Sequence, residues 1–302
     1  MLSLFHPRRE IPRLSRGLAA LVGFIIFGIA WNLLSLDYER DGKAFLLPSP
    51  QRVASTFADY FGYGSKTEAK VKAARQTLPA GQELDKTVLE IRTEARLELG
   101  ILGADLRVSI VRVTLAFLLS VAVGVPIGIA IGSLKIFESL IQPLVEFIRY
   151  VPVPALVPLL MIIFGIGEAP KIMLIFIGTV FQLMLMTADE IRRVPYELLQ
   201  VSYTLGGSRI EAITKVLLPG SLPGIFDAMR LCNGWAWTWL IVAELVAANE
   251  GMGFRIVKYQ RFLLTDKIFV YLIVLGLIGL LIDFLFRALN QRMFRWAETN
   301  KR

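Results

Sequence analysis

The sequence predicts an all-α fold of the polytopic membrane class, with six transmembrane helices. Of the 302 residues, 55% are hydrophobic and only 19% are charged, and the mean hydropathy is +0.59. The charges cluster between long apolar runs, whereas a soluble domain of this length spreads them more evenly. The net charge of +8 is explained by basic residues that flank membrane spans. Nucleic-acid binding is disfavoured, because no basic stripe interleaved with aromatic residues is present.

A transmembrane helix needs about 20 predominantly apolar residues. The predicted spans are 18–36, 113–134, 146–167, 171–188, 226–249 and 268–286. Basic residues precede the first span, but no small-residue cleavage site follows it, so we interpret it as an uncleaved anchor. Lys and Arg favour the cytoplasmic side of a membrane. They gather in the N-terminal tail, in 189–222 and in the C-terminal tail, so we expect both termini in the cytoplasm.

The loop between the first two spans is long, and we expect an extracytoplasmic helical insert at 62–103. Two stretches rich in Ala, Glu, Lys and Arg flank the break 79-PAG-81, which is typical of a helical hairpin. Two roles stay open for this insert: it either contacts a partner protein or is only a solvated surface.

Glycine and proline positions carry information about packing. Gly124, Gly128 and Gly132 share one face of the second span, where a neighbouring helix can approach closely. The alternative is that glycine is simply common in membrane helices. The third span is expected to be kinked or broken, since each proline removes a helical hydrogen bond. Its prolines are Pro143, Pro152, Pro154 and Pro158. Membranes tolerate such a break only against protein or a wet cavity.

The chain has one cysteine and one histidine, which excludes a disulfide framework and a metal site built on Cys/His clusters. Cys232 is expected to be a small core residue, and His6 to be solvated in the basic N-terminal tail. No catalytic, cofactor-binding or metal-binding residue is predicted on this chain.

A polar segment between the fourth and fifth spans predicts a helix–turn–helix. Pro195 suits the first position of a helix, and Gly206 or Gly207 can take the left-handed conformation that ends one. Ser208 and Glu211 form a capping-box pattern that begins the next helix.

The second helix of this segment, which covers 195–218 in all, is amphipathic. Its apolar side chains fall on one side and are Ile210, Ile213, Val216 and Leu217. Pro219 is expected to stop this helix and Ser221 to cap the following span. An amphipathic helix can dock in a groove on another protein or lie on lipid, and periodicity alone leaves both open.

The segment resembles the coupling-loop signature of binding-protein-dependent ABC transporter permeases, E-A-A-x-x-x-G followed after nine residues by I-x-L-P. The matching residues are Gly206, Val216, Leu218 and Pro219. The E-A-A positions hold 200-QVS-202 instead. The stretches 46–53, 143–172 and 243–254 are similar to the nitrate/sulfonate/taurine/bicarbonate branch of these permeases.

The resemblance implies the MetI-like permease fold, in the cytoplasmic (inner) membrane of a bacterium. It implies a homodimer of permeases that forms the translocation path and two ABC ATPase subunits that each accept a coupling helix. An extracytoplasmic solute-binding protein would deliver a small anion or polar organic solute. No cofactor is expected on this chain, and ATP-Mg is expected on the partner ATPase, because no G-x-x-x-x-G-K-[ST] loop occurs here.

Two sets of site residues follow. Those expected to couple to the ATPase are Gly206, Gly207, Ser208, Arg209, Glu211, Leu218 and Pro219. The hypothesis is that G206V or P219A uncouples ATP hydrolysis from uptake. The candidate residues of the translocation path are Arg149, Pro152, Pro154, Trp235 and Glu244. Trp235, Trp237 and Trp239 spread around their helix, which favours interface anchoring and packing.

Glu244 lies deep in the fifth span, where a carboxylate costs about 2.5–3.5 kcal/mol and should face protein or water. It either lines the path or makes a structural hydrogen bond, and Arg149 or Arg112 could pair with it. Arg149 could equally attract an anion itself.

Two rival functions stay open: a membrane-embedded enzyme, and a channel or secondary transporter whose amphipathic helix lies on the membrane surface.

Overall fold

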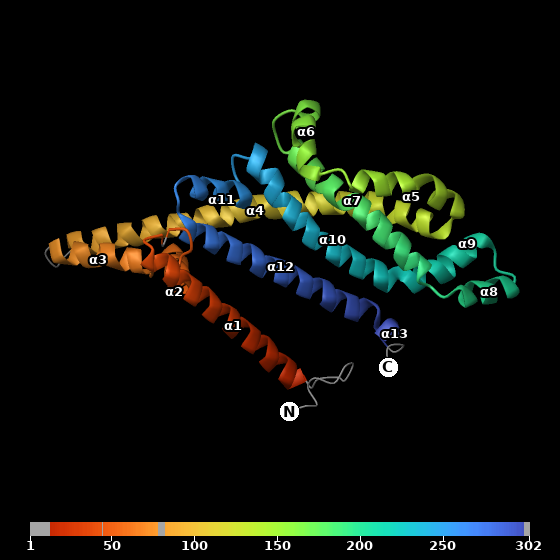
Figure 1. Ribbon diagram of the computed structural model, residues 1–302, viewed down its shortest axis with the longest axis horizontal. Coiled ribbons are helices and arrows are strands. Elements are labelled where there is room, and N and C mark those ends of the chain that lie inside the picture. The colour runs from red at the N-terminus through yellow and green to blue at the C-terminus, as the bar shows by residue number, and fades with distance from the viewer. Residues whose placement is uncertain (1–12, 44, 78–81, 299–302) are drawn as a thin grey trace. The chain divides into compact units, whose positions relative to one another are not determined.

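The computed structural model describes residues 13–43, 45–77 and 82–298 (Figure 1). Every regular element in these ranges is helical. The described residues fall into two compact units, one built from 1–100 and 259–270 and the other from 101–258 and 271–302. His6 and the outermost basic residues of both termini lie outside the described ranges.

The first unit holds three complete helices and the beginning of a fourth: α1 (Arg13–Arg40), α2 (Pro50–Tyr60), α3 (Ser65–Thr77) and the first part of α4 (Gln82–Ser133). The second unit holds the rest of α4 and the remaining elements, with one exception. These are α5 (Lys135–Arg149), η2 (Val153–Leu156), α6 (Val157–Phe164), α7 (Ala169–Arg192), α8 (Tyr196–Thr204), α9 (Arg209–Glu211), η3 (Ala212–Leu217), α10 (Leu218–Ala247), α11 (Met252–Arg261), α12 (Thr265–Met293) and α13 (Arg295–Glu298). The exception is the end of α11 and the start of α12, within 259–270, which belong to the first unit.

Four helices among the described residues are long and apolar enough to cross a membrane: α1, α4, α7 and α12. The pair formed by α5 and residues 153–164 gives a fifth span if it is counted as one. The long helix α10 is not among them, since polar and charged residues such as Asn233 and Glu244 interrupt its apolar run.

The third predicted span is broken, as its prolines indicate. Helix α5 ends at Arg149, and the following helical residues lie at 88° to it. The chain leaves α5 after Arg149, and Pro152 has an extended backbone with a ψ of 109°, so helical structure resumes only at Val153. Pro143 lies inside α5, so the break comes from the later prolines.

Helix α4 joins the predicted insert to the second span without interruption. It contains 52 residues, which at 1.5 Å per residue makes it about 78 Å long. The hydrocarbon core of a bilayer is only about 30 Å thick. The helix therefore extends far beyond a membrane at one end or both, and the insert does not end as a separate element at residue 103.

The insert is a helical hairpin, as its composition predicts, with α3 and the start of α4 as its arms. Lys70 on α3 pairs with Glu94 on α4 at 3.2 Å. Residues 78–81, which join the two arms in the sequence, lie outside the described residues. In the same unit, the buried carboxylate of Asp266 accepts hydrogen bonds from Lys66 at 2.7 Å and from Thr56 at 3.0 Å. These bonds hold α2 and α3 against the start of α12.

The glycine face of α4 packs directly against α7 in the second unit. A Cβ atom added at Gly128 would lie 2.5 Å from the carbonyl oxygen of Met184, and one at Gly132 would lie 2.7 Å from Cβ of Ile191. Real Cβ atoms do not approach so closely, so these glycines are required for helix contact. Cys232 on α10 is fully buried beside Leu183, as expected of a core residue.

Candidate functional site

The turn between α8 and α9 is a Schellman motif, which ends α8 and reverses the chain. The amide of Gly207 donates to the carbonyl of Ser202 at 2.9 Å, and that of Gly206 donates to Tyr203 at 3.0 Å. Gly206 has a φ of +82°, so it is the glycine that takes the left-handed conformation. Pro195 precedes the first residue of α8 and is its N-cap, one position earlier than expected.

A capping box begins the next helix, as the sequence predicts. The hydroxyl of Ser208 accepts from the amide of Glu211, and the carboxylate of Glu211 accepts from the amide of Ser208 at 3.0 Å. Lys215 also donates to this carboxylate at 2.8 Å. These hydrogen bonds, that from Lys215 first, lower the pKa of Glu211 to about 2. The two short helices therefore meet at a turn that is hydrogen-bonded on both sides.

The expectation that Pro219 stops the second helix is wrong. Helix α9 passes through the π-helical turn η3 directly into α10, and Pro219 lies in the first turn of α10. A proline is tolerated there because the wider π turn absorbs its missing hydrogen bond and bulky ring. Ser221 does not cap a new span, since its hydroxyl donates to the carbonyl of Leu218 at 3.1 Å. The segment is thus continuous with α10.

The expected apolar face of this helix is not free to dock elsewhere. Ile213 and Leu217 pack against Ile191 and Ile225 of the same unit. Ile210 is the exception on this face, since it is exposed, as are further apolar side chains on either side of the turn. We call them the elbow patch; they are Val201 (55% exposed), Tyr203 (48%), Leu205 (83%) and Ile210 (73%).

The remaining predicted coupling residues lie at this turn or farther along the same continuous helix. A Cβ atom at Gly207 would lie 2.7 Å from the hydroxyl of Ser202. The close approach of Gly207 to the end of α8 therefore requires glycine there. Arg209 is exposed at the start of α9, and Leu218 is the first residue of α10. Five of the seven predicted coupling residues, Gly206 to Arg209 and Glu211, therefore lie at the turn beside the elbow patch, whereas Leu218 and Pro219 lie beyond η3 in the first turn of α10.

Of the predicted path residues, Arg149 and Trp235 line one cavity of about 410 Å³. Arg149 is the last residue of α5, and Trp235 lies on α10. Pro152 and Pro154 form the adjacent bend, and Glu244 does not line this cavity.

Glu244 is fully buried in a hydrogen-bond network at the other end of α10. Its carboxylate accepts from Arg112 at 2.8 Å, from the hydroxyl of Ser109 at 2.7 Å and from the amide of Gly253 at 2.7 Å. Of the two sequence-based alternatives, these contacts favour the structural one. The pairing with Arg112 was expected as one of two possibilities, and Arg149 is not the partner.

Sequence reasoning missed the other members of this network. Arg112 also holds Glu168, the residue before α7, through bonds of 2.5 and 2.7 Å. Together with Lys171, at 2.8 Å, Arg112 lowers the pKa of Glu168 to about 2. Asp105 accepts from the amide of Gly251 at 3.0 Å. The available signal was the spacing of Asp105, Ser109 and Arg112, which places three polar side chains on one face of α4 where its apolar run begins.

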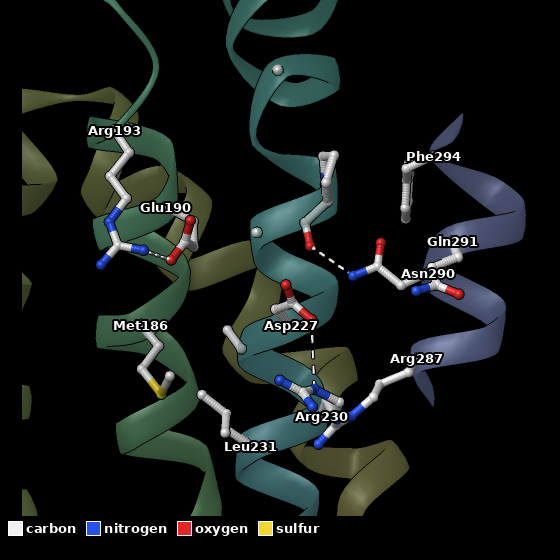
Figure 2. Close-up of a pocket in the computed structure, with 14 residues that line it drawn as sticks. Met186, Glu190, Arg193, Asp227, Arg230, Leu231, Arg287, Asn290, Gln291 and Phe294 are labelled. Carbon is white, nitrogen blue, oxygen red and sulfur yellow. Dashed lines mark hydrogen bonds and ion pairs between the residues drawn. The ribbon is translucent and has the colours of Figure 1, made fainter. Parts of the chain in front are cut away.

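A second cavity, of about 840 Å³, lies beside the start of α10 and is lined by charged side chains (Figure 2). Figure 2 shows Glu190 on α7 paired with Arg193, the residue after that helix. Asp227 and Arg230 on α10 and Arg287 and Asn290 on α12 lie around the same space. Asp283 pairs with Arg287 at 2.7 Å and also with Arg230 at 3.0 Å. The charges lining this cavity are mostly compensated by one another.

The fold and the site together define a class: a polytopic helical membrane protein that carries a stiff polar helix–turn–helix between two of its long helices. The chain belongs to the family of binding-protein-dependent transport system inner membrane components, whose pattern matches residues 124–295.

Relatives named for a transport function agree with this assignment. The chain is 33% identical to the taurine transport system permease protein TauC of Escherichia coli strain K12, over 72% of this chain and 80% of that protein. It is 36% identical to the putative aliphatic sulfonates transport permease protein SsuC of Bacillus subtilis strain 168, over 66% and 72% of the two chains. It is 32% identical to the bicarbonate transport system permease protein CmpB of Synechococcus elongatus, over 58% and 63%.

Solved structures share the fold. A chain of the inward-facing MetNI methionine ABC transporter matches with a TM-score of 0.58 at 19% identity, over 65% of this chain and 97% of that one. An amino acid ABC transporter matches with a TM-score of 0.53 at 17% identity, over 67% and 97%. The chain is therefore a membrane-embedded permease subunit of an ABC transporter, a transport component and not an enzyme, and ATP hydrolysis belongs to a separate subunit.

Proposed function

We propose that this chain moves a small anion or polar organic solute into the cell by alternating access, driven by a separate ATPase. The observation that carries the proposal is the turn between α8 and α9. A Schellman motif and a capping box fix its two helices, and the second runs unbroken into α10. A motion applied at the elbow patch would therefore reach a long core helix. A flexible loop in its place would absorb the motion instead.

The assembly that we propose is a homodimer of this chain with two ABC ATPase subunits and an extracytoplasmic solute-binding protein. The elbow patch is apolar and exposed, as a surface that enters a groove on an ATPase should be. In each subunit, Gly206, Gly207, Ser208, Arg209, Glu211, Leu218 and Pro219 would hold or present this surface. ATP-Mg would bind only to the ATPase.

The membrane arrangement proposed here has six spans, with the bent pair as the third and α10 as the fifth. Both termini and the elbow would lie in the cytoplasm, because their segments carry the clustered Lys and Arg. The hairpin of α3 and α4 would then project from the opposite side.

The solutes for which the relatives are named support the substrate class. They include taurine, aliphatic sulfonates and bicarbonate, all of which are small and carry an anionic group.

The test is uptake of a radiolabelled solute into liposomes that contain the chain, its ATPase and its binding protein. We expect uptake that requires ATP on the side of the membrane where the ATPase lies. This uptake should persist without any ion gradient. Uptake driven by an ion gradient in the absence of ATP would contradict the proposal and favour a secondary transporter, with the elbow lying on lipid.

A further inference from the structure

The cavity that contains Arg149 has a composition that points to one kind of solute. Its lining is mostly apolar and includes three aromatic rings, those of Phe181 on α7 and of Trp235 and Trp239 on α10. Trp235 and Trp239 are four residues apart and share one face of α10, so the expectation that the tryptophans spread around their helix is wrong for this pair. Polar groups are few, and the residues that provide them are Arg149, Gln182 and Thr238. We call this space the Arg149 cavity. Its volume of about 410 Å³ falls in the ordinary range of small-molecule sites, about 300–1,000 Å³.

The charge of Arg149 is not neutralised by an acidic side chain. Its guanidinium donates to the amide oxygen of Gln182 at 3.4 Å and to the hydroxyl of Tyr150 at 3.3 Å. Among the described residues, no carboxylate lies within 4 Å of it. Arg112, by contrast, is saturated by Glu168 and Glu244. Arg149 therefore carries a positive charge and unused donors at the edge of an apolar space, which is an arrangement suited to an anion.

From this geometry we propose that the Arg149 cavity binds organic anions with a hydrocarbon body, and that it disfavours inorganic oxyanions. The anionic head, a sulfonate or carboxylate, pairs with Arg149, and the carbon chain packs against Trp235, Trp239 and Phe181. This inference rests on the proposed transport function and narrows its substrate class. Nitrate or bicarbonate would satisfy the arginine but would leave the aromatic walls unused, so the apolar contribution to binding would be lost.

Gly178 limits the size of the cavity. It lies on α7 in the cavity wall, and a Cβ atom there would fall 2.6 Å from Cδ1 of Trp239. A larger residue must displace this tryptophan, which itself lines the cavity. Substitution of Gly178 therefore changes the space available to the carbon chain without altering the arginine.

The experiment measures ligand binding to the permease–ATPase complex without its binding protein, in nanodiscs of phosphatidylcholine. The probes are nitrate and the sodium salts of methane-, ethane-, propane- and butanesulfonate. Isothermal titration calorimetry measures the affinity of each probe. We expect affinity to rise about fourfold with each methylene, the factor that corresponds to one buried CH₂ group. Nitrate should bind more weakly than all four.

The variants separate the two parts of the site. R149Q should weaken every sulfonate at least tenfold, whereas R107Q, the same change at an exposed arginine of the same unit, should not. G178A should weaken the binding of butanesulfonate more than that of methanesulfonate, because the displaced Trp239 reduces the space that the longer carbon chain needs.

Three results would overturn the inference: equal affinity for nitrate and butanesulfonate, affinity independent of chain length, or unchanged binding in R149Q. A lipid headgroup is the competing source of an anion. If nanodiscs containing phosphatidylglycerol show the cavity occupied by lipid, while sulfonates fail to bind in phosphatidylcholine, the inference is wrong. If the binding experiment fails while ATP-driven uptake is observed, only the inference about the Arg149 cavity is wrong and the proposed function stands. Uptake driven by an ion gradient without ATP would contradict both proposals.

Discussion

The guanidinium of Arg112 donates to the carboxylate of Glu244 across 2.8 Å, and only 1% and 0% of the two side chains are exposed. This pair joins α4 to α10, and the amide of Gly253 adds a bond of 2.7 Å to the same carboxylate. A Cβ atom at Gly251 would collide with both side chains, so the turn between α10 and α11 closes over the pair. The end of α10 opposite the elbow is thereby fixed.

Removal of one partner from this buried pair should destabilise the protein strongly. We expect E244A to lower the free energy of unfolding by about 3–5 kcal/mol, because Arg112 would keep a buried and partly uncompensated charge. E250A is the control, since the side chain of Glu250 is exposed and only its backbone carbonyl binds Arg112. Thermal unfolding of the purified complex measures both. Equal effects of the two variants would show that the pair does not hold α10.

The glycine contact between α4 and α7 predicts a difference between two glycines of one helix. G128A should destabilise by about 1–3 kcal/mol, because the added methyl group meets the backbone of α7. G103A has nothing within 4 Å of its new Cβ and should be neutral or stabilising by up to about 1 kcal/mol. Unfolding of the two variants in the same detergent is the measurement. A neutral G128A would mean that the helices are farther apart than described.

The turn at Gly206 predicts uncoupling by a change that leaves the spans intact. A β-branched residue at a φ of +82° is a strained outlier, so G206V should distort the Schellman motif. The expected result is a rise in ATP hydrolysed per solute molecule transported, with normal insertion into the membrane.

P219A should uncouple ATP hydrolysis from uptake less than G206V does. Pro219 does not end a helix, and alanine would preserve the continuous path from the elbow into α10. If P219A uncouples as strongly as G206V in the same liposome assay, continuity with α10 is not what transmits the motion.

The capping box predicts a dependence on pH. The pKa of Glu211 is lowered from 4.5 to about 2, so the ionised carboxylate stabilises the turn, fully above pH 4.5. This stabilisation is lost as the pH falls from about 4.5 towards 2. Hydrogen exchange of residues 208–212, corrected for the intrinsic rate, should therefore show less protection at pH 3 than at pH 6. E211Q can still accept the capping bond but lacks the charge, so its protection should change little between these values.

Local patterns in the sequence predicted much of this structure, because local chemistry decides those features. Gly206 ends α8 and Ser208 caps α9 through residues at most five positions away. The broken third span and the glycine face of α4 also follow from single residue types at fixed spacing.

Contacts between distant residues could not be predicted in the same way. Arg112 meets Glu168 and Glu244, which are 56 and 132 positions away, and no helical period relates them. The packing of the coupling segment against its own chain was missed for the same reason. Amphipathicity does not say whether Ile213 packs against another protein or against Ile191 of the same chain. At Pro219, a π turn overrode the usual rule that proline ends a helix.

The central claim is that the elbow patch contacts an ATPase, and site-directed cross-linking tests it most directly. Cys232, the single cysteine of the chain, is fully buried, so L205C provides one accessible thiol for a benzophenone maleimide. After illumination of the native membrane complex, we expect an adduct with a polypeptide that binds ATP, and we expect its yield to change when ATP is added. I166C, at an equally exposed apolar position far along the chain, should give no such adduct. Adducts of L205C with lipid alone would contradict the account.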